Sequence, residues 1–223
     1  KNTMDHYLVE SEAYDVDVKG TFGLTQADID ALAALDGVDS VMPVISTDAV
    51  VTAGGQELVG RFIGIENIAS YGAEESAGGS GDAEDGGSKQ AVLNTLTLTE
   101  GKWPEAAGEV VVAQPTNYFE ELKVGDTITL PETLDNTYGD VYAAKTFTVV
   151  GIVSSPDYFY NDAREITTLG SGVVGAVIYG EMDDLYYLQK SGSVFSYLSS
   201  SLIAGFLEVD PIDVLYTDCY VKI

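Results

Sequence analysis

The side chains that most often carry covalent catalysis are scarce in this sequence of 223 residues. His6 is the only histidine and Cys219 the only cysteine, which favours neither a zinc cluster nor a paired nucleophile and base. Ser154 and Ser155 precede a proline, which is typical of a strand leaving into an extended turn. A lone cysteine in an apolar, strand-like segment is typical of a buried thiol, and no internal disulfide can form. We therefore expect no catalytic residue and no enzyme activity.

The glycine-rich run GSGVVG, residues 170–175, matches the G-x-G-x-x-G spacing of dinucleotide sites. Such a site needs a helix directly after the glycines, because the helix N-terminus binds the pyrophosphate. Here the glycines lead into the apolar, β-branched residues 173–179, which predict a strand. The run therefore indicates a tight turn into a strand, and we expect no nucleotide cofactor.

Acidic residues dominate the charge, because 36 Asp and Glu against 10 Lys and Arg give a formal net charge of −26. This charge argues against nucleic acid, whose phosphates need a basic patch, and against docking on anionic lipid headgroups. A solubility surface explains the acidity most simply, and a face that binds cations or cationic peptides is the alternative.

Carboxylates that stand close together in the sequence do not have the spacing of a known metal or glycosidase site. They are Asp15 with Asp17, Asp28 with Asp30, Asp183 with Asp184, and Asp82 with Glu84 and Asp85. Solvated acidic faces explain them, with a low-affinity calcium site as the alternative. We expect no bound metal.

Aromatic side chains gather in segments that the sequence predicts to be loops, namely Tyr138, Tyr142, Tyr158, Phe159 and Tyr160. Exposed loop aromatics can form a ligand platform or contact a protein partner. The same side chains could instead cap the core between two lobes. We take the five as candidate partner contacts, with a role in the core as the alternative.

The elements that would position these residues begin with a β-α-β-β pattern over residues 1–65. Thr25 and Asp28 form a capping-box pair that opens a helix over residues 25–36, with an apolar stripe that reaches Leu35. The flanking strands are predicted at residues 13–19, at 38–51 with a kink near Pro43, and at 57–65 after a turn at Gly54 and Gly55. Residues 73–90 are acidic and rich in Gly and Ser, which predicts a mobile loop.

Short strands dominate the middle of the chain, and a second α+β part follows. Strands are predicted at residues 110–113, 126–130, 146–153, 173–179 and 216–223, and a helix at 182–189. This order predicts an α+β fold with two lobes. A discontinuous α+β lobe would comprise residues 1–95 and 173–223, and an inserted β-rich lobe residues 96–172.

Five phrases, in this order, resemble the extracytoplasmic (MacB-like periplasmic core) domain of FtsX-like ABC transporter permeases. They are Y-D-V-D-V through V-x-P-V at 14–44, L-T-E-G-K-W-P through G-E-V-V-V at 98–112, V-G-D-T-I-T-L at 124–130, V-V-G-I-V-x-S-P-D-Y at 149–158, and T-x-L-G-S-G through V-I-Y at 167–179. The resemblance covers nearly the whole chain, with residues 73–90 as an insertion.

The resemblance implies a porter-like α+β lobe with an inserted β-rich lobe, on the extracytoplasmic side of the cell membrane. It implies that the domain couples ATP hydrolysis by a cytoplasmic ATPase to substrate export, lipoprotein handling or signalling. The implied partners are that ATPase, an extracytoplasmic protein or peptide, and a second permease copy. No apolar run of about 18 residues and no signal peptide is visible. The resemblance therefore implies a soluble piece of a membrane protein. A freestanding bacterial surface or adhesion module is the alternative.

Overall fold

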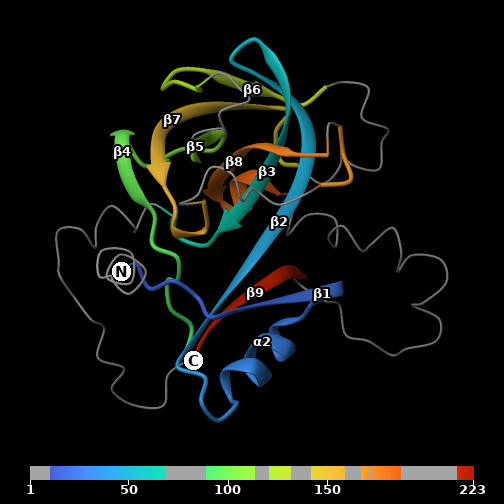
Figure 1. Cartoon of the computed structure of the whole chain (residues 1–223), viewed down its shortest axis with the longest axis vertical. Coiled ribbons are helices and arrows are strands. Elements are labelled where there is room, and N and C mark those ends of the chain that lie inside the picture. Colours follow the sequence, from blue (N-terminus) through green and yellow to red (C-terminus); the bar gives the residue numbers. More distant parts are fainter. Residues whose placement is uncertain are drawn as a thin grey trace.

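The computed structural model describes residues 11–68, 89–113, 121–131, 142–158, 167–170, 172–186 and 215–223. These parts of the chain are mostly β, with a few short helices (Figure 1). In chain order the elements are β1 (Val16–Leu24), α2 (Gln26–Ala33), β2 (Ser40–Ala53), β3 (Gln56–Ile65), β4 (Thr97–Gly101), β5 (Glu109–Ala113), β6 (Thr127–Thr129), β7 (Thr146–Ser154), the 3₁₀ turn η2 (Pro156–Tyr158), β8 (Val174–Glu181), α5 (Met182–Leu185) and β9 (Tyr216–Lys222).

The nine described strands form one mixed sheet, which closes on itself at one end. Eight strands follow the order β1-β9-β2-β3-β8-β5-β7-β4, and β6 pairs with both β2 and β7. Thr129 of β6 lies opposite Thr52 of β2, while Thr127 lies opposite Thr148 of β7. The pairs therefore lead from β2 through β3, β8, β5, β7 and β6 back to β2, which makes a barrel (upper half of Figure 1).

The long strand β2 belongs to two parts of the molecule. Its first residues pair with β9 and its later residues pair with β3 in the barrel. The first half of β2 forms, with β1, β9 and α2, a lower layer away from the barrel (Figure 1). No interruption occurs near Pro43, because β2 is one continuous strand from Ser40 to Ala53. The Val41 N–H donates to the Lys89 carbonyl oxygen, on the edge of β2 that faces away from β9. The nitrogen of Pro43, two residues later, lies on this same edge, so the proline removes no hydrogen bond between β2 and β9.

Helix α2 begins where the capping box predicts. The Asp28 N–H donates to Thr25 Oγ1 at 3.2 Å, and the Thr25 N–H donates to Asp28 Oδ2 at 2.8 Å. The Thr25 hydroxyl also donates to Asp28 Oδ2 at 2.7 Å, and this bond first and the Thr25 N–H bond second lower the pKa of Asp28. Ile29 is fully buried, but Leu35 is 54% exposed because the helix ends at Ala33. The predicted apolar stripe was therefore too long at its C-terminal end.

One hydrophobic cluster fills the barrel and continues into the lower layer. Its barrel members include Val51, Phe62, Val110, Ile128, Phe147 and Ile178, and its lower-layer members include Ile29, Cys219 and Val221. A second cluster contains Trp103, Val150, Tyr179 and Tyr220. Cys219 is buried, as predicted, and burial raises its pKa to about 11.

The predicted α+β class implies more helix than the described residues contain, because these are mostly β. Within the described residues the helix expected at 182–189 is the single turn α5, because Tyr186 has extended backbone and bridges to Tyr142. β8 pairs in parallel with β3 and antiparallel with β5, so the sheet continues across the expected boundaries at residues 96 and 173. The division into two lobes stays a prediction.

Candidate functional site

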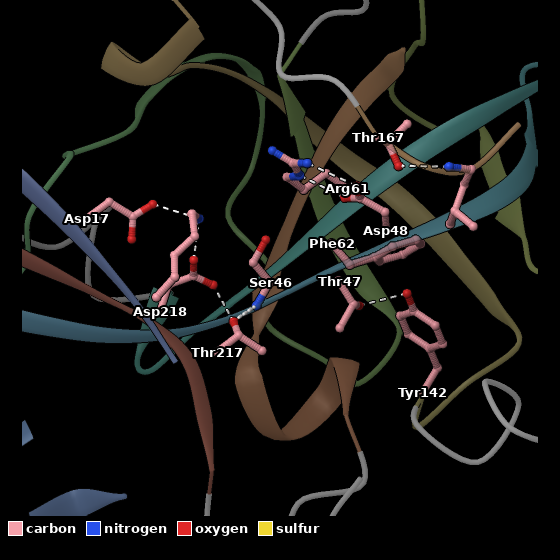
Figure 2. Close-up of polar contacts among 12 residues, drawn as sticks. Asp17, Ser46, Thr47, Asp48, Arg61, Phe62, Tyr142, Thr167, Thr217 and Asp218 are labelled. Atoms are coloured by element: carbon pink, nitrogen blue, oxygen red, sulfur yellow. Dashed lines mark hydrogen bonds and ion pairs between the residues drawn. The ribbon is translucent and has the colours of Figure 1, made fainter. Parts of the chain in front are cut away.

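An open cleft of about 550 Å³ lies where β2 passes from the lower layer to the barrel. Its lining consists of Lys19, Gly20, Ser46, Thr47, Asp48, Arg61, Thr167, Thr168, Leu169, Thr217 and Asp218. Leu169 is the one lining residue with a large apolar side chain, and two ion-pair systems stand on either side of Ser46 (Figure 2). Most of the lining residues therefore carry charged or hydroxyl groups.

Lys19 of β1 forms the ion-pair system at the lower layer. Its ammonium lies 2.7 Å from Asp17 Oδ2 and also pairs with Asp218 Oδ1 of β9. Desolvation alone would lower the pKa of Lys19, but hydrogen bonds to Asp17 and Asp218 and their negative charges outweigh it and raise that pKa. Lys19 therefore stays protonated and cannot act as a general base at neutral pH.

Thr217 ties this ion-pair system to β2. Its hydroxyl donates to Asp218 Oδ2 and accepts the Ser46 N–H at 2.7 Å. Asp218 is only 4% exposed, so its carboxylate is held by groups on β1 and β9 rather than by solvent. The lower wall of the cleft is thus a fixed arrangement of charges.

Arg61 of β3 and Asp48 of β2 form the ion pair at the barrel wall. They lie directly opposite each other in the β2–β3 register. Arg61 Nε donates to Asp48 Oδ1 at 2.7 Å and Nη2 donates to Oδ2 at 2.9 Å, which is the two-pronged geometry of strong arginine–carboxylate pairs. The side chains are 11% and 19% exposed, so both charges are largely withdrawn from water.

Thr47 connects the floor of the cleft to the barrel core. Its hydroxyl lies 2.8 Å from the Tyr142 hydroxyl and 2.9 Å from that of Tyr186. The Tyr186 hydroxyl donates in turn to the Phe62 carbonyl oxygen at 2.7 Å. Burial of Tyr186 raises its pKa, so it remains a neutral donor. The network therefore anchors the cleft floor to α5 at the end of the barrel.

The loop at the upper rim contains the described residues of the GSGVVG run. The Gly172 N–H donates to the Leu169 carbonyl oxygen at 2.9 Å, and both Gly170 and Gly172 have positive φ. β8 begins two residues later at Val174, which confirms the predicted turn into a strand. A Cβ on Gly170 would lie 2.9 Å from Val59 Cγ2, so this glycine lets the loop pack on β3.

The described lining offers charged groups and hydroxyls around an open space. Both cations of this lining already bond to carboxylates. The arrangement suits non-covalent contact with a polar ligand or protein surface.

Among the five aromatic candidates, the structure describes the side chain of Tyr142 alone. Tyr142 is 3% exposed, and its ring centroid lies 4.9 Å from that of Phe62. It belongs to the core, which was the alternative left open by the sequence, and it is not a surface contact. Tyr158 ends η2, with its side chain outside the described residues, and Tyr138, Phe159 and Tyr160 lie outside them altogether.

The acidic pairs have separate structural partners. Asp15 accepts from the Ile223 N–H at 2.9 Å, Asp17 pairs with Lys19 and Asp28 caps α2. In α5, burial and then the charge of Asp183 raise the pKa of Asp184. No group of three or more metal-ligating side chains occurs among the described residues. His6, Asp82, Glu84 and Asp85 lie outside them.

Sequence reasoning missed the cleft, although part of its signal was present. A hairpin centred on Gly54 and Gly55 places Asp48 opposite Arg61, as the register confirms. Asp17 and Lys19 are two apart on one strand and therefore share a face. The predicted discontinuous lobe put the first and last strands in one sheet region, but no pattern indicated the register of β1 and β9 that brings Asp218 to Lys19.

Comparisons with known proteins identify similar structures but no sequence relative. No protein-family model matches the chain, and no curated protein matches it. The structure is similar to the extracellular domain of the noncanonic ABC-type transporter YknZ from Gram-positive bacteria, with 12% identity, a TM-score of 0.39, and coverage of 91% of this chain and 74% of that one. It is also similar to the periplasmic region of MacB from Actinobacillus actinomycetemcomitans, with 14% identity, a TM-score of 0.37, and coverage of 92% and 66%. Within the described residues, none of the helices is long and apolar enough to cross a membrane.

Proposed function

We propose that this chain is the extracytoplasmic domain of an FtsX/MacB-like ABC transporter permease and that its role is mechanical. The ordered sequence phrases support the proposal, and one geometric observation carries it: the first and last described strands are neighbours. A domain that receives motion from two membrane helices needs both attachment points side by side, because only then does their relative movement act on one place.

Several bonds clip the first described residues to the end of β9. β1 and β9 pair antiparallel, with Val16 opposite Val221. The Asp15 N–H donates to the Val221 carbonyl oxygen at 2.9 Å, and Lys222 Nζ donates to the Ala13 carbonyl oxygen at 2.7 Å. The Ile223 N–H bond lowers the pKa of Asp15, which keeps this carboxylate charged beside Lys222. A tilt of these strands would move the lower layer as a unit.

The barrel lies on the other side of the molecule from the end of β9 (Figure 1). β2 runs continuously between the two parts and is fourteen residues long. A strand paired at both ends is stiff, so motion applied at β1 and β9 would reach the barrel through it. The barrel is therefore the proposed contact region for an extracytoplasmic protein or peptide.

The phrases that resemble the permease family have structural roles in the barrel. Glu109 Oε2 accepts from the backbone N–H groups of Glu105 at 2.8 Å and Ala106 at 3.2 Å, which closes the turn before β5. Asp126 Oδ2 likewise accepts the Lys123 N–H at 2.8 Å beside Gly125, whose φ is 97°. These carboxylates shape turns, which supports a domain without catalytic function.

The proposed partners act through other parts of the permease or at its outer surface. They are a cytoplasmic ATPase subunit or domain, an extracytoplasmic protein or peptide, and a second permease copy. The competing proposal is a freestanding surface or adhesion module, which the acidity and the strand content also suit.

Cysteine labelling in intact cells tests the proposal. Cys219 is fully buried, so Glu57→Cys at the exposed tip of the β2–β3 hairpin would supply one reactive thiol in this domain. The full-length protein, with cysteines elsewhere replaced, is treated with a membrane-impermeant maleimide. We expect labelling in intact cells and release of the protein from envelopes by detergent.

Two other outcomes would contradict the permease proposal. Labelling that needs permeabilised cells would place the domain inside the cell. Release by cell-wall digestion but not by detergent would favour the adhesion module. Wild-type protein is the matched control, since Cys219 should label only after unfolding.

A further inference from the structure

The segment that leads into β1, residues 11–14, is bonded to the chain just before β4. The Asn94 N–H donates to the Glu12 carbonyl oxygen at 3.0 Å, and the Thr95 N–H donates to that of Ser11 at 2.8 Å. The Tyr14 N–H donates to Asn94 Oδ1 at 3.1 Å. This lead-in segment, residues 11–14, therefore contacts the approach to β4, which pairs with the barrel strand β7.

The burial and backbone conformation of Asn94 suit this contact. It is only 5% exposed and has a φ of 53°, in the left-handed region that asparagine tolerates better than most residues. While its Oδ1 accepts from Tyr14, its Nδ2 donates to Asp157 Oδ2 at 2.7 Å. One amide side chain thus bonds the lead-in segment on one side and η2 on the other.

Beyond Asp157 the contacts continue into the barrel. η2 follows β7 directly, and the neighbouring Ser155 hydroxyl accepts from the Tyr179 hydroxyl of β8 at 3.0 Å. Ser155 and Tyr179 are each 3% exposed. A displacement of Asn94 would therefore act on β7 and β8, two central barrel strands.

The lead-in segment also contacts the lower layer. The Tyr14 ring stacks on that of Tyr220 of β9, with centroids 4.4 Å apart. Tyr14 consequently joins two parts of the molecule, through its ring to β9 and through its amide to Asn94. A directional bond also joins this segment to β9, because Lys222 Nζ donates to the Ala13 carbonyl oxygen at 2.7 Å.

We propose that Asn94 is a positioning residue that latches the lead-in segment to the barrel, so that this segment, which is also bonded to β9, joins the barrel to the lower layer. The latch is a property of the chain by itself, and its use in transmitting membrane-helix motion rests on the proposed function. Movement of the lead-in segment would then act on the barrel as well as on the lower layer. This route is separate from β2.

Two variants separate the contributions of the two side-chain hydrogen bonds of Asn94. Glycine accepts the positive φ but removes both side-chain bonds, so Asn94→Gly tests the latch without adding strain. Asp157→Ala removes the acceptor on η2 and keeps the bond to Tyr14. Asn94→Gly therefore breaks the latch on both sides of residue 94, and Asp157→Ala breaks it on the η2 side alone.

Spin-label distances in the 223-residue chain test the latch. One pair joins Glu12→Cys to Glu57→Cys, from the lead-in segment to the barrel tip. The control pair joins Asp36→Cys to Glu57→Cys, from the lower layer to the same tip, and the control positions are exposed. In Asn94→Gly we expect the 12–57 distribution to widen while the 36–57 distribution is unchanged, and in Asp157→Ala we expect the same pattern.

Amide hydrogen exchange gives a second readout. In Asn94→Gly the Tyr14 amide should exchange about tenfold faster, because its acceptor is lost, while the Val221 amide should not change. An unchanged 12–57 distribution would overturn the latch, and so would equal widening of both pairs, which would mean general loosening. Neither result depends on where the domain lies in the cell, so failure of the latch is distinguishable from failure of the proposed function.

Discussion

Gly101 of β4 and Gly151 of β7 lie directly opposite each other, and neither position has room for a Cβ atom. A Cβ on Gly101 would lie 2.2 Å from the Val150 carbonyl oxygen, and one on Gly151 would lie 2.5 Å from that of Lys102. Because both obstacles are backbone atoms, they cannot move aside as a side chain would. The two glycines therefore fix the close approach of β4 to the barrel.

Alanine at Gly101 should destabilise the chain strongly. Gly101 has a φ of 81° and Gly55 a φ of 80°, but a Cβ on Gly55 would have no atom within 4 Å. Both substitutions strain the backbone equally, so their difference isolates the steric clash. We expect Gly101→Ala to lower the free energy of unfolding by at least about 2 kcal/mol more than Gly55→Ala, measured by urea denaturation. Equal losses would show that β4 can move away without cost.

Removal of Arg61 should lower the free energy of unfolding more than removal of an exposed lysine does. Arg61→Met would leave the Asp48 carboxylate without its bidentate partner at a site where it is 19% exposed. We expect a loss of about 2 kcal/mol in unfolding free energy, which Asp48→Thr combined with Arg61→Val should largely restore. Lys102→Met is the control, because Lys102 is 49% exposed and should matter little. A double variant as unstable as the single one would mean that Arg61 stabilises the fold through other contacts.

Local signals in the sequence were sufficient for the turns and caps. The Thr25 capping box, the hairpin at Gly54 and Gly55, and the turn into β8 depend on residues within a few positions of one another. Their physics is contained in the local backbone and in short hydrogen bonds, so a pattern in the sequence predicts them directly.

Non-local pairings were not predictable in the same way. β6 is three residues long, yet it closes the barrel by pairing with the distant strand β2, and no pattern in Thr127–Thr129 indicates that partner. The same limit applies to the cleft, because Lys19 meets Asp218 across 199 positions. For Tyr142 the sequence left a partner contact and a core role both open, and no local pattern indicated its contact with Phe62.

Glu109 should make stability depend on pH in the acidic range. The pKa of Glu109 is lowered from its ordinary value of 4.5, mainly by the hydrogen bond from the Glu105 N–H. Burial raises this pKa, and the bond and charge of Lys102 lower it further. A lowered pKa in the folded state means that the stabilisation is complete above the unfolded value and is lost as pH falls through the folded value. The difference in unfolding free energy between wild type and Glu109→Gln should therefore be constant near neutral pH and shrink below about pH 4.5. A difference that stays the same down to about pH 3 would contradict this role.

Cys219 should report global unfolding. It is fully buried between β1 and β2, and burial raises its pKa to about 11 from an ordinary value of 9.0. At about pH 8 this shift leaves about a hundredfold less thiolate than in the unfolded chain, and the thiolate is the reactive form. We expect a thiol reagent to modify wild-type protein only across the urea unfolding transition, with the same midpoint as circular dichroism. Glu57→Cys supplies the control, since its exposed thiol should react at once in the folded chain. Fast modification of Cys219 without urea would mean that β9 opens locally, and the clip between Asp15 and Ile223 would then be too weak to transmit motion.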